Sequence, residues 1–201
     1  MTDYGLDLAV IGNGRTAALL EPSSRIVWWC LPRYDGDPVF CRLLSGGEDK
    51  GFTDVTLEGQ AEIRSNYVRN TAIVVTDLID DKGAGVRITD FAPRFRQFGR
   101  MHRPPMIIRR VDRLEGLCRI RARIRPRMDY GRYRALPIAG SNHIRYVSEA
   151  GSIRLTKEDE QHHYIPLDWV GRVDQHVHLS KDCAKARRRW QAAPGRSRLS
   201  M

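Results

Sequence analysis

Short runs of β-forming residues, each ended by a turn signal, most constrain the fold of this chain. Gly, Pro, Asp and Asn clusters interrupt the apolar and β-branched runs about every 8–12 residues, which is typical of an antiparallel sandwich. Almost no segment repeats apolar residues at the helical period of about 3.6. We therefore predict an all-β fold, a large antiparallel β-sandwich. The predicted strands are 6–11, 16–20, 25–30, 52–58, 62–68, 72–79, 86–91, 106–114, 117–125, 143–148 and 152–156.

Two adjacent tryptophans, Trp28 and Trp29, run into a turn that contains a proline, an arginine, a tyrosine and two aspartates. Neighbouring side chains in a strand point to opposite faces, so the two indoles cannot share one core. One of them must lie against another layer of the sandwich, a sugar or another domain. The candidate substrate-rim or domain-interface residues are Trp28, Trp29, Arg33, Tyr34, Asp35 and Asp37.

The two aspartates of this turn allow two interpretations. Asp35 and Asp37 could act as an acid and a base, but residues two apart in a turn more often hydrogen-bond to the local backbone and to solvent. We favour the turn-forming role. The sequence offers no nucleophile elbow, so no catalytic residue is assigned.

Composition excludes several classes of protein. With 201 residues, 41% hydrophobic and 29% charged, the chain resembles an ordinary globular protein of one domain with an appendage. No run approaches the about 18 apolar residues of a membrane helix, and the first residues do not resemble a secretory signal. Its four cysteines are widely spaced and read as reduced thiols. We expect a cytoplasmic protein without a membrane partner.

The net charge of +10 raises the question of nucleic-acid binding. Residues 181–201 hold seven basic residues and one acid, and so contribute +6 of that charge. We expect residues 1–165 to form the sandwich and residues 166–201 an aberrant, irregular or partly helical basic tail that is disordered. Because the charge is concentrated in this tail, we disfavour a specific nucleic-acid role.

Apolar and basic residues alternate most regularly at residues 118–125. In a strand, one face would carry Cys118, Ile120 and the other apolar residues, and the opposite face would carry four arginines. A row of like charges must face water, acids or a partner surface. We favour a solvated face. A contact face for another domain or subunit, or a phosphate site, remains an alternative.

Other motifs carry weaker signals. Residues 12–17 fit the glycine-rich dinucleotide fingerprint, but Pro22 follows too soon for the helix that this site needs, so we predict a hairpin turn. Two histidine pairs, His162 with His163 and His176 with His178 near Cys183, have spacings found among metal ligands. Neither pair is accompanied by a second ligand pair at a recognised spacing. We therefore expect neither a metal nor a cofactor.

Several long segments, in order along the chain, resemble the N-terminal region of bacterial glycoside hydrolase family 15 proteins, the glucoamylase and α,α-trehalase-like group. They are LDLAVIGNGRTAAL (6–19), WWCLPRYDGDPVFCRLL (28–44), YVRNTAIV (67–74), VRITDFAPR (86–94) and GSNHIRY (140–146). The resemblance runs from about residue 6 to about residue 164.

The resemblance implies a supersandwich-like domain that precedes an (α/α)6 barrel, in which two glutamates hydrolyse α-glucosidic bonds of trehalose or α-glucans with inversion. This chain ends before such a barrel could begin, so we expect a truncated, non-catalytic domain, from a frame shift near residues 157–170 or as a short paralogue. The Trp28–Asp37 segment would face the missing barrel and an α-glucoside at its rim. The alternative is a stand-alone carbohydrate-binding or nucleic-acid-binding module.

Overall fold

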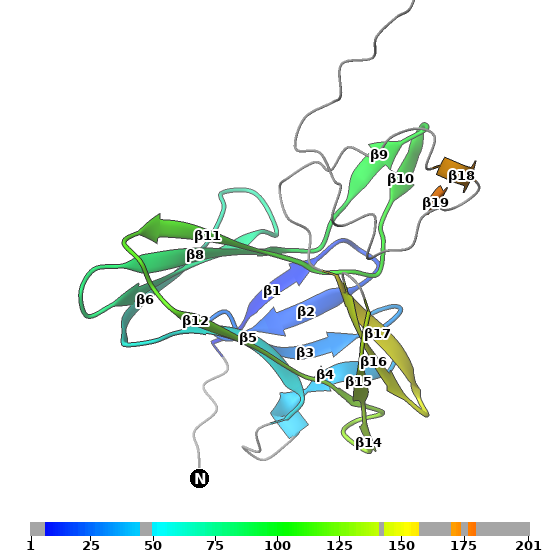
Figure 1. Ribbon diagram of the computed structural model, residues 1–201, viewed down its shortest axis with the longest axis horizontal. Helices are drawn as coiled ribbons and strands as arrows, with labels where there is room; N and C mark the ends of the chain where they lie inside the picture. The colour runs from blue at the N-terminus through cyan, green and yellow to red at the C-terminus, as the bar shows by residue number, and fades with distance from the viewer. Residues whose placement is uncertain (1–6, 45–49, 141–142, 157–169, 174–176, 180–201) are drawn as a thin grey trace, which may run out of the picture. The chain divides into compact units, whose positions relative to one another are not determined.

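The computed structural model describes residues 7–44, 50–140, 143–156, 170–173 and 177–179 (Figure 1). The chain forms two compact units. The first comprises residues 1–137 and 146–153, and the second comprises residues 138–145 and 154–201. Apart from a short 3₁₀ turn, η1 (Arg42–Leu44), all regular structure in these residues is β-strand. This confirms the predicted all-β fold class. Within the described residues, no helix has the length and apolar character required to cross a membrane.

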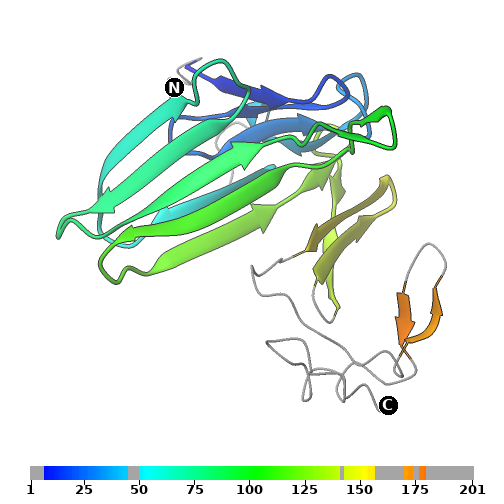
Figure 2. The same ribbon diagram turned by 90° about the horizontal axis from the view of Figure 1, so that it is seen from above.

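Two antiparallel sheets form the first unit (Figure 2). The six-stranded sheet has the order β1-β2-β3-β5-β12, and β4 pairs with β3 beside this path. Its strands are β1 (Ala9–Gly12), β2 (Ala17–Leu20), β3 (Ile26–Cys30), β4 (Pro38–Cys41), β5 (Phe52–Leu57) and β12 (Ile120–Arg125). The four-stranded sheet has the order β11-β8-β7-β6, with strands β6 (Gln60–Tyr67), β7 (Val74–Asp80), β8 (Gly85–Phe91) and β11 (Ile108–Glu115).

Smaller ribbons connect or follow these sheets. The pairs are β9 (Phe95–Gln97) with β10 (Arg100–His102), and β13 (Arg127–Met128) with β14 (Tyr133–Arg134). Three further strands, β15 (Leu136–Ala139), β16 (His143–Ser148) and β17 (Gly151–Thr156), form one sheet.

The apolar core lies between the two large sheets. Val55 and Leu57 of β5 pack against Leu78 of β7 and Val86 and Ile88 of β8. These residues alternate with polar ones along their strands, which is the pattern that places one face of each sheet against the other. A second cluster gathers the inward residues of β1–β4 with residues of the β13–β14 ribbon. Its buried members are Ile11, Ala18, Leu20, Ile26, Val39, Phe40, Val74, Met128 and Ala135.

The arginine-rich strand β12 lies at the edge of its sheet and pairs with β5. Its arginines, at positions 121, 123 and 125, share one face, as the alternation predicts. Arg121, Arg125 and the preceding Arg119 are exposed. Arg123 differs, because it lies opposite the buried Asp54 and binds its carboxylate. The face is therefore partly solvated and partly neutralised by β5.

The exposed face of the four-stranded sheet carries a ladder of alternating charge. Asp112 of β11 lies opposite Arg87 of β8, which lies opposite Asp77 of β7, which lies opposite Arg64 of β6. Arg87 donates two hydrogen bonds of 2.8 Å to Asp77. Cross-strand pairs of opposite charge stabilise a sheet at a surface in contact with water.

The described part of the predicted tail consists of strands. β18 (Val170–Val173) and β19 (Val177–Leu179) form an antiparallel hairpin within residues 166–201. This corrects the expectation of irregular or helical structure for these seven residues. The expected disorder of the tail falls on residues outside the described ranges.

Candidate functional site

The segment between β3 and β4 is a closed turn held by backbone hydrogen bonds. Its ends meet where the Leu31 amide donates to the Asp37 carbonyl at 3.2 Å, and inside it the Gly36 amide donates to Arg33 at 3.1 Å. A Cβ at Gly36 would lie 2.5 Å from the Leu31 carbonyl oxygen, closer than real Cβ contacts allow. Only glycine therefore fits this close approach. The Leu31–Pro32 peptide bond is cis.

The polar side chains of this turn point into solvent. Arg33 donates two hydrogen bonds to Asp35, Nε to Oδ1 at 2.9 Å and Nη2 to Oδ2 at 3.0 Å. Tyr34 between them is 62% exposed, and its amide donates to the Arg15 carbonyl at 3.1 Å. Asp37 is also exposed. We call Arg33, Tyr34, Asp35 and Asp37 the rim, a hydrogen-bonded turn that presents a tyrosine and a planar ion pair to solvent.

Trp29 is half-buried and packs against the core cluster of β1–β4. It lies opposite Ala18 on one side and Phe40 on the other, and its ring stacks on Phe40 with centroids 6.0 Å apart. Its indole Nε1 donates to the Thr16 hydroxyl at 2.8 Å, and that hydroxyl donates to the Cys30 carbonyl at 3.0 Å. Trp29 therefore serves the fold, and not the exposed rim.

Trp28 points to the opposite face of β3, as the strand period requires. Its cross-strand neighbours are Leu19 and Cys41, and its ring contacts the ring of Tyr130 with centroids 6.3 Å apart. Tyr130 belongs to the turn between β13 and β14 and has a φ of +55°. Trp28 is thus contacted by a tyrosine of the same chain. The sequence did not predict this contact, because the two residues are far apart in the chain and no local pattern links them.

Asn13 is a further residue that sequence reasoning did not assign. Its side-chain amide is buried and donates to the carbonyl oxygens of Pro93 and Pro104, each at 2.9 Å. Its Oδ1 accepts from the amides of Arg15 and Thr16 at 3.0 and 3.2 Å. The β1–β2 pairing of Gly12 with Ala17 confirms the predicted hairpin turn here. Asn13 joins this turn to the segment that carries β9 and β10.

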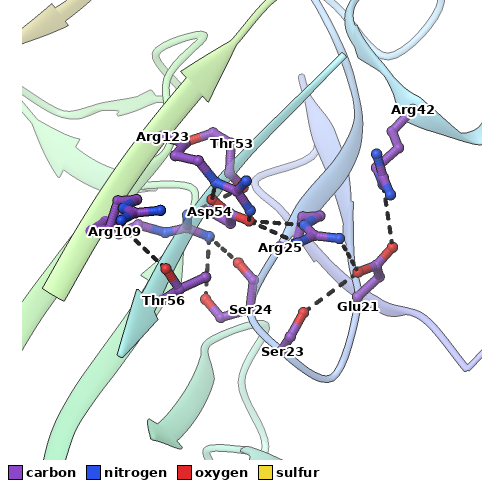
Figure 3. A network of polar contacts seen from close by, with 11 residues as sticks. Glu21, Ser23, Ser24, Arg25, Arg42, Thr53, Asp54, Thr56, Arg109 and Arg123 are labelled. Atoms are coloured by element: carbon purple, nitrogen blue, oxygen red, sulfur yellow. Dashed lines mark hydrogen bonds and ion pairs between the residues drawn. The ribbon is translucent and has the colours of Figure 1, made fainter. Parts of the chain in front are cut away.

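A polar network surrounds Asp54 on the six-stranded sheet (Figure 3). Arg25 and Arg123 bind its buried carboxylate at 2.9 and 2.7 Å. Both guanidinium groups also lie over the ring of Phe52, 5.0 Å from its centroid, and Arg42 lies 5.2 Å away. Such cation–π contacts cover an aromatic ring and hold the cations in place.

The second buried carboxylate, Asp90, is also occupied. Arg109 donates to it from Nε at 2.7 Å, and the Ser24 hydroxyl donates at 2.6 Å. Both buried carboxylates among the described residues are therefore engaged in ion pairs with arginine.

The thiols beside the turn are not activated. Burial raises the pKa of the Cys30 thiol, although a hydrogen bond with the Trp28 side chain lowers it in part. Burial likewise raises the pKa of Cys41, partly offset by the charges of Arg127 and Lys50. A nucleophilic cysteine needs a lowered pKa, so these two cysteines are structural.

One surface cavity among the described residues lies apart from the rim. A shallow surface cavity of about 390 Å³ is lined by Thr56, Leu57, Glu58, Arg119, Ile120 and Arg121, all on or next to β5 and β12. Within the described ranges, no three His, Cys, Asp or Glu side chains gather closely enough to hold a metal ion. His162, His163, His176 and Cys183 fall outside these ranges, and only the backbone of His178 is described.

Comparison with known proteins gives two family matches. The profile of the "Trehalase-like, N-terminal" family matches residues 6–157. A second profile, of an uncharacterized protein conserved in bacteria (DUF2171), matches residues 146–187. Among curated proteins, the chain is similar to a trehalase of Thermoplasma volcanium, with 26% identity over 151 residues. The alignment covers 74% of this chain and 24% of that trehalase, so the chain spans about a quarter of its relative. No solved structure matches the chain significantly.

Proposed function

The chain belongs to the trehalase-like N-terminal domain family, and from that premise we propose that it is a non-catalytic β-sandwich domain that supports the hydrolysis of α-glucosidic bonds. The reacting carboxylates would lie on a separate (α/α)6 catalytic domain. Inverting hydrolysis needs two carboxyl groups about 6.5–9.5 Å apart with room for a water. The two buried carboxylates among the described residues are instead engaged by arginines.

One observation carries the proposal, namely that the backbone of the rim is hydrogen-bonded while its side chains are exposed. Its backbone is closed by hydrogen bonds to itself and to Arg15, while Tyr34 and the Arg33–Asp35 pair point into solvent. An ordered exposed surface with a tyrosine and an arginine has the composition of an interface core. We propose that the rim packs against the catalytic domain and shapes the entrance of its sugar pocket.

A chimera tests this role. Residues 6–157 would replace the aligned segment of the Thermoplasma volcanium trehalase, and glucose release from trehalose and maltotriose would be measured. We expect no release by the present chain alone and release by the chimera. The double variant Arg33→Ala/Tyr34→Ala should lower kcat/KM of the chimera about tenfold. Without the rim, the substrate is held less well at the pocket entrance, which raises the activation free energy of hydrolysis.

Glu62 and Arg64 provide a matched control for the rim. They form another exposed ion pair two residues apart, with side chains 48% and 61% exposed, against 55% and 59% for Asp35 and Arg33. The variant Glu62→Ala/Arg64→Ala should leave the chimera's activity unchanged. Equal losses in the two double variants, or glucose release by the chain alone, would contradict the proposal.

A second candidate function, a carbohydrate-binding module, is favoured by the Trp28–Tyr130 pair. Partly exposed aromatic rings stack on the apolar faces of sugars, and Tyr130 is 56% exposed beside Trp28. Titration with trehalose or maltose should then change tryptophan fluorescence. The change should disappear in Tyr130→Ala and persist in Tyr34→Ala.

A further inference from the structure

The ribbon of β9 and β10 with its flanking residues, 94–103, carries positive charge without any acid. We call this segment the arm. No described carboxylate forms an ion pair with its arginines, in contrast to the neutralised arginines around Asp54. Its basic residues are Arg94, Arg96, Arg100, His102 and Arg103. Such an uncompensated row favours an anionic partner.

The tip of the arm exposes a phenylalanine. Phe98 is 92% exposed and has a φ of +50°, and Gly99 follows with a φ of +73°. Two successive positive φ values make the tight hairpin turn that usually carries Asn-Gly. A bulky residue in this region is strained, and such strain concentrates at functional positions. The chain holds a large apolar ring in solvent where Asn would form the turn more easily.

The arm gains little stability from its own packing. Every residue from 94 to 103 is exposed, and the paired strands contain three residues each. Its one internal ring contact stacks Phe95 on His102, with centroids 5.7 Å apart and planes 14° apart. A two-stranded ribbon without an apolar layer is marginal in water. A partner that covered the arm would supply the missing layer.

The base of the arm is fixed to the same end of the sandwich as the rim. Asn13 binds the carbonyls of Pro93 and Pro104, which flank the arm, and the neighbouring Arg15 carbonyl binds Tyr34. Figure 1 shows β9 and β10 continuing beyond the ends of β8 and β11 as a narrow hairpin. A surface that contacts the rim therefore lies within reach of the arm.

We infer that the arm is a docking element that binds an acidic protein surface and inserts Phe98 into an apolar socket there. The inference rests on the proposed function for the identity of this partner, the polypeptide that carries the catalytic domain. Single-stranded nucleic acid would instead need successive aromatic platforms. The stacking of Phe95 on His102 leaves Phe98 as the one fully presented ring of the arm.

Photo-crosslinking of the full chain in its native host tests the inference. Benzoylphenylalanine would replace Phe98 or, as a matched control, Leu117, which is 90% exposed in the segment between β11 and β12. We expect position 98 to form an adduct with a protein whose crosslinked segment has net negative charge, and position 117 not to form it. Neutralising the arm with Arg94→Gln/Arg96→Gln/Arg100→Gln/Arg103→Gln should reduce the adduct about tenfold, because the charges hold the surfaces together.

Each other outcome is informative. No adduct at position 98, a nucleic-acid adduct, the same adduct at both positions, or an adduct that survives charge neutralisation would overturn the arm's role. Circular dichroism would check that each variant keeps its strand content. We expect it to, because all the substituted positions are exposed. An adduct with an acidic protein that has no glycoside hydrolase domain would uphold the docking arm and overturn the proposed function instead.

Discussion

The indole nitrogen of Trp29 donates a 2.8 Å hydrogen bond to the hydroxyl of Thr16. This bond holds the half-buried Trp29 against the core cluster and connects β3 to the start of β2. Trp28, the adjacent residue, is left on the opposite face beside Tyr130. The two half-buried tryptophans thus lie on opposite faces of β3, Trp29 against the core cluster and Trp28 against Tyr130. The exposed rim that follows them carries the proposed interaction.

Thr16→Val should destabilise the sandwich by about 1–3 kcal/mol, the cost of leaving buried polar groups unpaired. The substitution keeps the shape but removes the partner of both the Trp29 indole and the Cys30 carbonyl. Urea unfolding followed by circular dichroism measures the change. Thr56→Val serves as control, because it removes only a long hydrogen bond of 3.4 Å from a half-buried hydroxyl to the Arg121 carbonyl. It should change the free energy of unfolding by less than about 1 kcal/mol. A similar loss in both variants would contradict the buried network.

Asn13→Ala should loosen the base of the arm. It removes the donors to Pro93 and Pro104 and leaves two carbonyl groups without their partner, at a cost of about 2 kcal/mol or more. We expect faster hydrogen exchange at the amides of residues 94–103 than in the unchanged protein. Asn66→Ala, on the exposed edge strand β6, should leave exchange in the arm unaltered. Unchanged exchange in Asn13→Ala would show that Asn13 does not hold the arm.

Buried and exposed ion pairs should respond differently to loss of one partner. Asp90→Ala leaves the guanidinium of Arg109 uncompensated between the sheets and should cost about 3–5 kcal/mol. Asp77→Ala removes the partner of Arg87 on the solvated ladder and should cost less than about 1 kcal/mol. Chemical unfolding of both variants measures the difference. Comparable losses would mean that the Asp90 pair is not buried as described.

The charge ladder makes a prediction about pH. The hydrogen bonds and charge of Arg87 hold the pKa of Asp77 below its ordinary value of 3.8. Because the folded pKa is the lower one, the stabilisation is complete well above pH 3.8 and is lost as the pH falls through the folded pKa. Carboxyl NMR titration should therefore place the Asp77 midpoint below 3.8, and Arg87→Gln should raise it. A midpoint unaffected by Arg87→Gln would contradict the pairing.

The sequence predicted the features that depend on local pattern. The hairpin turn at Gly12–Ala17, the opposite faces of Trp28 and Trp29, and the alternation of residues 118–125 follow from turn chemistry and from the two-residue period of a strand. These regularities need no knowledge of distant residues, and the structure confirms them.

Long-range partners could not be predicted in this way. The bonds of Asn13 reach residues 80 and 91 positions away, and Asp54 meets an arginine 69 positions away. Tyr130 reaches Trp28 from a turn in which Asp129, Tyr130 and Gly131 all have positive φ. Asp129 and Gly131 mark the turn itself, but no local signal shows that its tyrosine meets the distant Trp28. The arm was missed for the same reason, since Phe98 occupies the position where asparagine is expected.

The most direct test of the central claim is photo-crosslinking from the rim itself. Benzoylphenylalanine would replace Tyr34, which is an exposed aromatic residue, in the full chain in its native host, with Leu117 as the control position. We predict a Tyr34-dependent adduct with a polypeptide that carries a glycoside hydrolase catalytic domain. The absence of such an adduct at position 34, or an equal adduct at position 117, would contradict the account of the rim as an interface.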